Sequence, residues 1–385
     1  MKKINRRDFL KVGVGSIAAA AFAGPALTSC GNSSNSRPRA GRKGRLEMKF
    51  TPYVVELRHK FTISGFSRDT TTVILIEVSY DGVIGYGEAA LPPYMAGQTL
   101  ETATAFLKKV NLSQFSNPFQ LEDILTYIDG IEPGMSCPKA GIDIALNDLV
   151  GKLLDHPLYE IWGYNKDKTP CTSFTIGMDT EEMIRQKVHE AAPYKILKVK
   201  LGSTELNDKM IVNTIRSETD KPIIVDANQG WKDKHYALEM INWLSEKDVR
   251  LVEQPMPKTV IDDMAWVTEH SPLPTFADEA CQRLVDIPRL YGLFSGINIK
   301  LIKCTGLREA NKMIAMARCY GMKVMIGCTT ETSCAISAAA QLTPMVDFAD
   351  IDGNLLITND CFDGMHIVDG RITLNDRPGI GVIKV

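Results

Sequence analysis

The chain has 385 residues, of which 44% are hydrophobic, enough for a large core and about two domains. Its formal charge of −2 hides an asymmetry, because the first 45 residues carry ten Lys or Arg and one acid. The remainder therefore holds 34 basic and 45 acidic residues, a charge of −11. Nucleic-acid binding needs a basic surface, so this acidic body excludes a nucleic-acid partner.

The first 30 residues have the pattern of an export signal. A basic start precedes a mildly apolar stretch, Val12 to Leu27, which is too short and too rich in Gly and Ala to span a membrane stably. Residues 5–11 resemble the twin-arginine export motif, although Asn5 stands where Ser or Thr is usual. Residues 27–30 resemble a bacterial lipobox that would lipidate Cys30. A plain secretory signal is the alternative, and either one predicts a periplasmic or lipid-anchored protein.

Residues 31–47 are rich in Ser, Asn, Arg and Gly, which predicts a flexible tether. Residues 48–165 then begin with strand patterns, among them Val73–Val78 and Ile84–Glu88, joined by a hairpin turn at Asp81-Gly82. Apolar residues at three-and-four spacing follow and indicate helices, as in Ala140–Leu149. This order of strands followed by helices predicts an α+β domain.

Residues 166–353 repeat a short apolar strand that ends in a polar residue and is followed by a helical segment. The repeats recur every 22 to 28 residues, the length of one βα unit, and eight such units close a barrel. The last strand lacks a full helix after it. We therefore expect a (β/α)7β modified TIM barrel, with residues 354–385 returning to complete the α+β capping domain. The expected strands are Thr172–Gly177, Ile196–Gly202, Pro222–Asn228, Val249–Pro255, Pro274–Glu279, Gly296–Ile302, Lys323–Cys328 and Phe348–Gly353.

Three carboxylates, Asp226, Glu253 and Asp278, end three consecutive strands of this barrel. Barrel enzymes build their active sites at the C-terminal ends of the strands, so the three side chains are expected to converge. Hard oxygen ligands without His or Cys suit Mg²⁺, and we expect one ion per subunit. The alternative is that each carboxylate separately caps the helix that follows it.

Lysines occupy two further strand ends. Lys198 and Lys200 alternate on the second strand and point to one face. Two neighbouring ammonium groups are expected to lower each other's pKa, which would make a lysine a usable base. Lys300 ends the sixth strand, four units round the ring, and should face Lys200 across the mouth. The alternative is a set of solvated lysines.

This arrangement suits removal of a proton next to a carboxylate. Loss of that proton places a second negative charge on the carboxylate, and a divalent ion stabilises the resulting enediolate. Bases on opposite faces allow one lysine to remove the proton and the other to return it from the other side. The predicted outcome is racemisation or epimerisation.

The sequence at this point resembles the enolase superfamily, in its muconate-lactonizing subgroup, over residues 48 to about 380. The matching motifs are Ile142–Leu146, Lys198-Val199-Lys200, the three carboxylates and Asn298-Ile299-Lys300. The resemblance implies that Lys200 and Lys300 are the acid/base pair and that Lys198 helps to bind the substrate carboxylate.

Within the subgroup, Asp350-Ile351-Asp352 resembles a segment of Ala-Glu-type dipeptide epimerases that holds the free ammonium of the dipeptide. A turn or helix cap is the alternative for this segment. The resemblance also places Thr175, Cys328 and Thr330 at the substrate. It places Arg68 in a loop of the first domain that binds the glutamate side chain, although the sequence leaves open that Arg68 is solvated.

These observations predict a Mg²⁺-dependent isomerase that inverts the second residue of a dipeptide, with L-Ala-D/L-Glu from cell-wall peptide as the favoured substrate. The alternatives in the same subgroup are an N-acylamino acid racemase, an o-succinylbenzoate synthase and a cycloisomerase. A non-catalytic solute-binding lipoprotein is the alternative of another class. The sequence leaves open a homo-oligomer, and it predicts membrane contact only through Cys30.

Overall fold

The structure, a computed structural model, describes residues 44–63, 66–92 and 97–385. The predicted export signal, with Cys30, and residues 31–43 of the predicted tether lie outside the described residues. Within the described ranges, no helix is both long enough and apolar enough to cross a membrane. The eight cysteines of these ranges are all free thiols.

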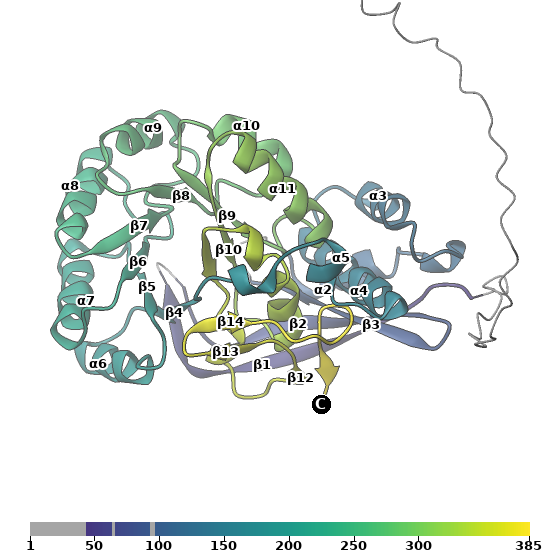
Figure 1. The fold of residues 1–385 in the computed structure, drawn as a ribbon. Helices are drawn as coiled ribbons and strands as arrows, with labels where there is room; N and C mark the ends of the chain where they lie inside the picture. Colours follow the sequence, from purple (N-terminus) through teal and green to yellow (C-terminus); the bar gives the residue numbers. More distant parts are fainter. Residues whose placement is uncertain (1–43, 64–65, 93–96) are drawn as a thin grey trace, which may run out of the picture. The chain divides into compact units, whose positions relative to one another are not determined.

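The N-terminal part is an antiparallel sheet of β1 (Glu47–Ile63), β2 (Phe66–Tyr80) and β3 (Val83–Ala90). The turn between β2 and β3 is Asp81-Gly82, where both residues have positive φ (49° and 81°), as the predicted hairpin turn requires. β1 and β2 form a long hairpin that reaches from this sheet to the barrel beside β4 (Figure 1).

Helix α4 (Ser136–Leu154) is buried along nearly all its length, from Cys137 to Gly151, and packs on β3. Glycines make this contact close, since a Cβ on Gly87 would lie 2.0 Å from the carbonyl oxygen of Gly141. The other helical elements of this part are α2 (Leu100–Leu107), η1 (Leu112–Gln114), α3 (Leu121–Ile131), α5 (Leu158–Ile161) and η2 (Lys166–Lys168).

Eight parallel strands follow in chain order and form the barrel. The bridge between Thr172 and Ala349 brings its first and last strands together. The observed strands lie within the predicted ones: β4 (Ser173–Ile176), β5 (Ile196–Lys200), β6 (Ile223–Asp226), β7 (Val249–Glu253), β8 (Thr275–Ala277), β9 (Gly296–Lys300), β10 (Lys323–Gly327) and β11 (Phe348–Asp350).

The helices between the strands lie outside the ring in Figure 1. Only a 3₁₀ turn, η5 (Gly353–Leu356), follows β11, so the predicted (β/α)7β architecture is confirmed. The helical elements are α6 (Glu181–Glu190), α7 (Glu205–Glu218), α8 (Lys234–Ser245), α9 (Ile261–His270), η3 (Leu284–Asp286), α10 (Ile287–Leu290), α11 (Leu307–Cys319), α12 (Ser333–Ala340) and η4 (Thr343–Met345).

Apolar side chains fill the inside of the barrel. Ile224, Leu251, Phe276 and Met325 form a small buried cluster of their own. The first three stand two residues before Asp226, Glu253 and Asp278, respectively. Because residues i and i+2 of a strand share a face, the three carboxylates continue this inward-facing side toward the C-terminal mouth.

The C-terminal segment runs back along the N-terminal sheet. Leu57 of β1 bridges to Ile357, and Asn359 accepts a 2.8 Å hydrogen bond from the backbone of Glu56 through its side chain. Lys384 pairs with Glu77 of β2 at 2.7 Å. The strands of this segment are β12 (Phe362–Asp363), β13 (His366–Val368), β14 (Arg371–Thr373) and β15 (Ile383–Lys384). The capping layer is thus built from both ends of the described chain.

Candidate active site

The C-terminal mouth of the barrel gathers the predicted carboxylates. Asp226, Glu253 and Asp278 are fully buried, and each offers an oxygen within 4.8 Å of the oxygens offered by the other two. Gln254 aligns two of the strand ends, since its side-chain oxygen accepts hydrogen bonds from the backbone of Asp278 (3.0 Å) and Ala280 (3.1 Å). The structure therefore brings three hard oxygen donors into one small volume.

Each of the three carboxylates has one oxygen held by a neighbouring donor. Its other oxygen faces the lysines of the mouth. The donors are the Asn228 backbone to Asp226 Oδ1 (2.9 Å), Asn298 Nδ2 to Glu253 Oε1 (2.7 Å), and Lys303 Nζ to Asp278 Oδ1 (2.5 Å). The orientation of each carboxylate is fixed by these contacts, so one oxygen of each always points into the site.

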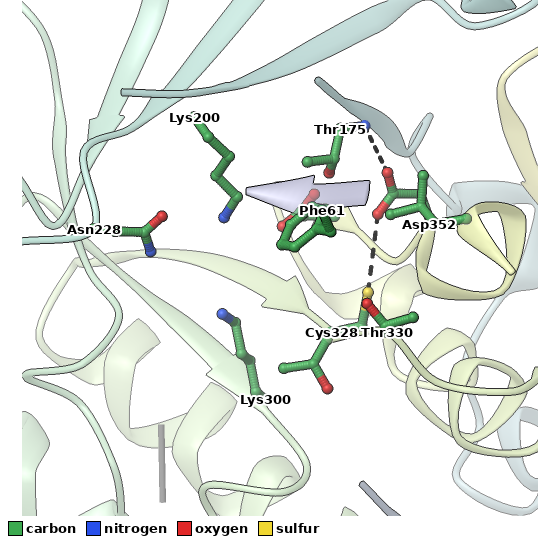
Figure 2. Close-up of a pocket in the computed structure, with 11 residues that line it drawn as sticks. Phe61, Thr175, Lys200, Asn228, Lys300, Cys328, Thr330 and Asp352 are labelled. Atoms are coloured by element: carbon green, nitrogen blue, oxygen red, sulfur yellow. Dashed lines mark hydrogen bonds between the residues drawn. The ribbon is translucent and has the colours of Figure 1, made fainter. Parts of the chain in front are cut away.

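The predicted lysines stand around these carboxylates. Lys198 Nζ lies 2.7 Å from Glu253 Oε2 and 3.4 Å from Asp226 Oδ2. Lys200 Nζ lies 2.6 Å from Asp226 Oδ2, and Lys300 Nζ lies 2.7 Å from Asp278 Oδ2. In Figure 2 the ammonium groups of Lys200 and Lys300 point toward each other from opposite sides of a cavity that both residues line.

The expected mutual lowering of lysine pKa values is wrong for Lys198. Burial disfavours its charged form, but the nearby carboxylates of Asp350, Glu253 and Asp226 together outweigh burial and raise the pKa of Lys198 well above its usual value. The pKa of Lys300 is also raised, because Asp278 and Glu253 outweigh its burial. The prediction failed because it considered the repulsion between neighbouring lysines without the surrounding acids.

Eight buried charged groups at the mouth form a network whose charges balance, and the buried carboxyl of Asp352 lies outside it. Four ammonium groups pair with four carboxylates, each through at least one contact of 2.7 Å or less. A buried charge is tolerated only when it is paired, and this network meets that condition without an unmatched charge. Its members are Lys198, Lys200, Lys300 and Lys303 with Asp226, Glu253, Asp278 and Asp350.

Asp350 and Asp352, predicted to act as a pair, have different surroundings. Asp350 accepts a 2.7 Å hydrogen bond from Ser173 and pairs with Lys198 at 2.5 Å. Asp352 accepts a 2.6 Å hydrogen bond from the backbone of Thr175 and lines the cavity (Figure 2). Burial, and then the charge of Asp350, raise the pKa of Asp352 to about 7. The contact with Lys198 compensates the charge of Asp350.

Arg68 extends from β2 of the capping layer to the barrel. Its guanidinium donates to the hydroxyl of Thr71 (2.7 Å) and to the hydroxyl of Thr330 (3.0 Å), which follows β10. The side chain is buried rather than solvated. Thr330 lines the same cavity as Thr175 and Cys328, so the structure brings Arg68 to the rim of that cavity.

Sequence reasoning missed Asn228, Asn298, Lys303 and Phe61. Alternation along the strand could have found Asn298, which stands two residues before Lys300 on β9. Asn228 lies beyond the end of β6 and has a positive φ of 42°, so alternation does not place its side chain. Lys303 follows the end of β9, where alternation no longer applies, and its ammonium donates to both an oxygen of Asp278 and the backbone of Asn298 (2.9 Å). Phe61 lies in β1 and lines the cavity, a contact that only the tertiary fold reveals.

The three carboxylates fit a magnesium ion. All the donor atoms are carboxylate oxygens, the ligand type that Mg²⁺ prefers. Glu253 Oε2 is buried and has no hydrogen-bond partner, although Lys198 Nζ is close to it. A buried carboxylate oxygen without a hydrogen-bond donor is suited to bind a metal cation.

Comparison with known proteins agrees with this geometry. Residues 46–163 match the N-terminal domain of the mandelate racemase / muconate lactonizing enzyme family, and residues 179–383 match the enolase C-terminal domain-like family. The chain therefore belongs to the enolase superfamily, in the family of mandelate racemase and muconate lactonizing enzyme.

Two curated relatives are epimerases. The chain is 57% identical to an L-Ala-D/L-Glu epimerase of Bacteroides thetaiotaomicron, over 99% of this chain and 100% of the relative. It is 36% identical to an L-Ala-D/L-amino acid epimerase of Pedosphaera parvula, over 86% of this chain and 97% of the relative.

Solved structures give the same picture. A substrate-liganded L-Ala-D/L-Glu epimerase from Bacillus subtilis superposes with a TM-score of 0.83 at 25% identity, over 88% of this chain and 99% of the other. A dipeptide epimerase from Enterococcus faecalis, complexed with Mg and L-Leu-L-Tyr, gives a TM-score of 0.82 at 29% identity, over the same shares.

Replacing Asn298 by Leu should weaken Mg²⁺ binding by about tenfold or more, because Glu253 then loses the donor that fixes its orientation. Titration calorimetry with Mg²⁺ measures this directly, without substrate. Asn242→Leu, on the exposed side of α8, is the control for the substitution itself and should bind Mg²⁺ like the unchanged protein. Equal affinity in the Asn298 variant would show that the hydrogen bond does not position the ligand.

Proposed function

We propose that the protein is a Mg²⁺-dependent dipeptide epimerase that inverts the α-carbon of the second residue, with L-Ala-D/L-Glu as its substrate. The observation that carries this proposal is that Lys200 and Lys300 line one cavity and that each contacts a carboxylate of the triad, Asp226 and Asp278 respectively. The names of the relatives support it, since both curated relatives above are epimerases of dipeptides that begin with L-Ala.

Asp226, Glu253 and Asp278 would hold the ion, one per subunit. When bound, Mg²⁺ supplies positive charge that stabilises the second negative charge appearing on the substrate carboxylate as the α-proton leaves. Lys198, buried beside the triad, holds the substrate carboxylate in place through its ammonium group. The network of four lysines and four carboxylates at the barrel mouth has no net charge, so it does not repel the carboxylate of a substrate.

The lysines carry the proton. The neutral amine of one lysine takes the α-proton from its face of the substrate, and the ammonium of the other donates a proton to the opposite face. The α-carbon is thereby inverted, and the roles of Lys200 and Lys300 exchange for the other epimer. Water is kept from the reacting carbon because both lysines are more than nine-tenths buried and Phe61 of the hairpin lines the same cavity.

Asp352 distinguishes a dipeptide from other carboxylates. It lines the cavity with Thr175 and Cys328, and the pairing of Asp350 with Lys198 leaves Asp352 as the carboxylate that meets the substrate. A free α-ammonium would pair with it, whereas an N-acylated amino acid or a cyclic acid brings no cation. This argues against the racemase, synthase and cycloisomerase alternatives. The complete set of lysines and carboxylates argues against a binding protein without catalysis.

Arg68 accounts for a preference for glutamate. Its guanidinium, held by Thr71 and Thr330, is positioned to bind an anionic side chain on the second residue, through charge-assisted hydrogen bonds.

Substituting either lysine should separate the two half-reactions. In D₂O, the full-length protein with Mg²⁺ should exchange the α-proton of the second residue of L-Ala-L-Glu and form the L-Ala-D-Glu diastereomer. Lys200→Met and Lys300→Met should each lose epimerisation by about 10³-fold or more, yet each should still exchange the α-proton of one epimer only. Proton NMR follows both signals. Exchange of both epimers by either variant would rule out the two-base mechanism.

Replacing Arg68 by Met should lower kcat/KM for L-Ala-L-Glu by about tenfold to a hundredfold, the effect of losing a hydrogen bond to a charged group. Activity on L-Ala-L-Met should change by less than about threefold, since that side chain has no charge to bind. The two substrates are assayed side by side with both proteins. An equal fall for both would mean that Arg68 supports the fold of the hairpin rather than glutamate recognition.

We further propose export and attachment to the cell envelope through a lipid on Cys30, supported by the basic start, the short apolar stretch and the lipobox-like residues 27–30. Full-length protein expressed in a bacterium should incorporate labelled fatty acid and fractionate with membranes, and Cys30→Ala should abolish the label. A soluble, unlabelled periplasmic protein would favour the plain secretory signal, and retention in the cytoplasm would contradict export. A homo-oligomer stays a prediction.

A further inference from the structure

A second pocket adjoins the substrate cavity. Leu57, Phe174 and Leu355 line only this second pocket, whereas Phe61, Thr175 and Leu356 line both. The residues common to both form the partition between the two spaces. Among them Phe61 has the largest side chain, and it comes from the capping layer rather than from the barrel.

The partition stands where the first residue of a dipeptide would lie. This step rests on the proposed function, in which the α-ammonium of the dipeptide meets Asp352. The ammonium and the side chain of the first residue are attached to the same carbon atom. That side chain must therefore lie within one residue's reach of Asp352, where Figure 2 shows Phe61 and Thr175. Leu356 lines the same cavity.

Phe61 is held firmly in this position. Beside it in β1, the backbone oxygen of Thr62 accepts a 3.1 Å hydrogen bond from Met178, just after β4. A Cβ on Gly177 would lie 3.7 Å from the Phe61 ring, so the barrel backbone after β4 packs close to the ring. The guanidinium carbon of Arg68 lies 6.0 Å from the ring centroid.

We propose that Phe61 is a specificity-determining residue that restricts the first residue of the dipeptide to a small side chain such as that of Ala, by closing the second pocket. Removing the ring would join the two spaces. The walls thus exposed include the apolar side chains of Leu57, Phe174 and Leu355. The charged residues that line the space are mostly basic, namely Arg58, Lys60 and Lys187, and its one carboxylate, Glu190, contacts His59 at 2.8 Å. The enlarged site would therefore accept an apolar first residue and disfavour a cationic one.

The test compares first residues while the second is kept constant. Full-length unchanged protein and Phe61→Ala, both with Mg²⁺, are assayed for α-proton exchange on L-Ala-L-Glu, L-Leu-L-Glu and L-Lys-L-Glu. The ratio of kcat/KM for L-Leu-L-Glu to that for L-Ala-L-Glu should rise by about tenfold or more in the variant. The ratio for L-Lys-L-Glu should rise less. Phe61→Leu, which keeps an apolar side chain in β1, should show an intermediate gain and serves if the Ala variant does not fold.

A refilling variant provides the matched control. Leu57→Trp in the Phe61→Ala background should fill the second pocket and reverse the gain. Leu57→Trp alone should keep the selectivity of the unchanged protein, because Phe61 already closes that pocket. An unchanged ratio in both Phe61 variants, or an unchanged protein that already prefers L-Leu-L-Glu, would overturn the role of Phe61 and leave the epimerase intact. No exchange by the unchanged protein with any dipeptide would instead overturn the proposed function itself, and this inference with it.

Discussion

The active site depends on the pairing of four buried ammonium groups with four buried carboxylates at one end of the barrel. Neither set could be buried alone, because an unpaired charge in the interior costs several kcal/mol even after relaxation. The parallel barrel solves this by giving each strand an inward-facing terminal position. Lys198 illustrates the result, since it contacts carboxylates from β6, β7 and β11 at once. The barrel is thus the framework that makes a dense, neutral network of charges possible.

The barrel and the capping layer contribute different kinds of residue to the site. The barrel strands carry Lys198, Lys200, Lys300, Asp226 and Glu253, whereas Asp278 and Lys303 follow the ends of β8 and β9. Each of these strands is paired with a neighbour on both sides. Arg68 and Phe61, which we propose to contact the side chains of the dipeptide, come from the hairpin of the capping layer. The hydrogen bond from Arg68 to Thr330 joins the hairpin to the barrel. Under this proposal, substitutions on the hairpin alter substrate choice while Lys200 and Lys300 stay in place.

Much of this could be predicted from the sequence, because the signals are periodic. The eight strands were found within a few residues, since each repeats an apolar run that ends in a polar residue. The raised pKa of Lys198 could not be predicted, because it depends on carboxylates such as Asp350, which is more than a hundred residues away in the chain. The burial of Arg68 was left open for the same reason, as its partner Thr330 lies on the opposite part of the fold. Local patterns identify which residues reach the mouth, but only the fold determines what each one touches there.

The hydrogen bonds between the C-terminal segment and the hairpin have a consequence for the order in which the protein folds. Asn359 bonds through its side chain to the backbone of both Glu56 and Val54, and the backbone oxygen of Asn359 accepts a hydrogen bond from Tyr53. These contacts join residues more than 300 positions apart. A chain emerging from the ribosome N-terminus first cannot form these contacts until nearly the whole sequence has been synthesised. The last barrel strand, β11, ends at Asp350, so every strand of the barrel is synthesised before Asn359, and the contacts between the hairpin and the C-terminal segment are among the last that the folding chain can make.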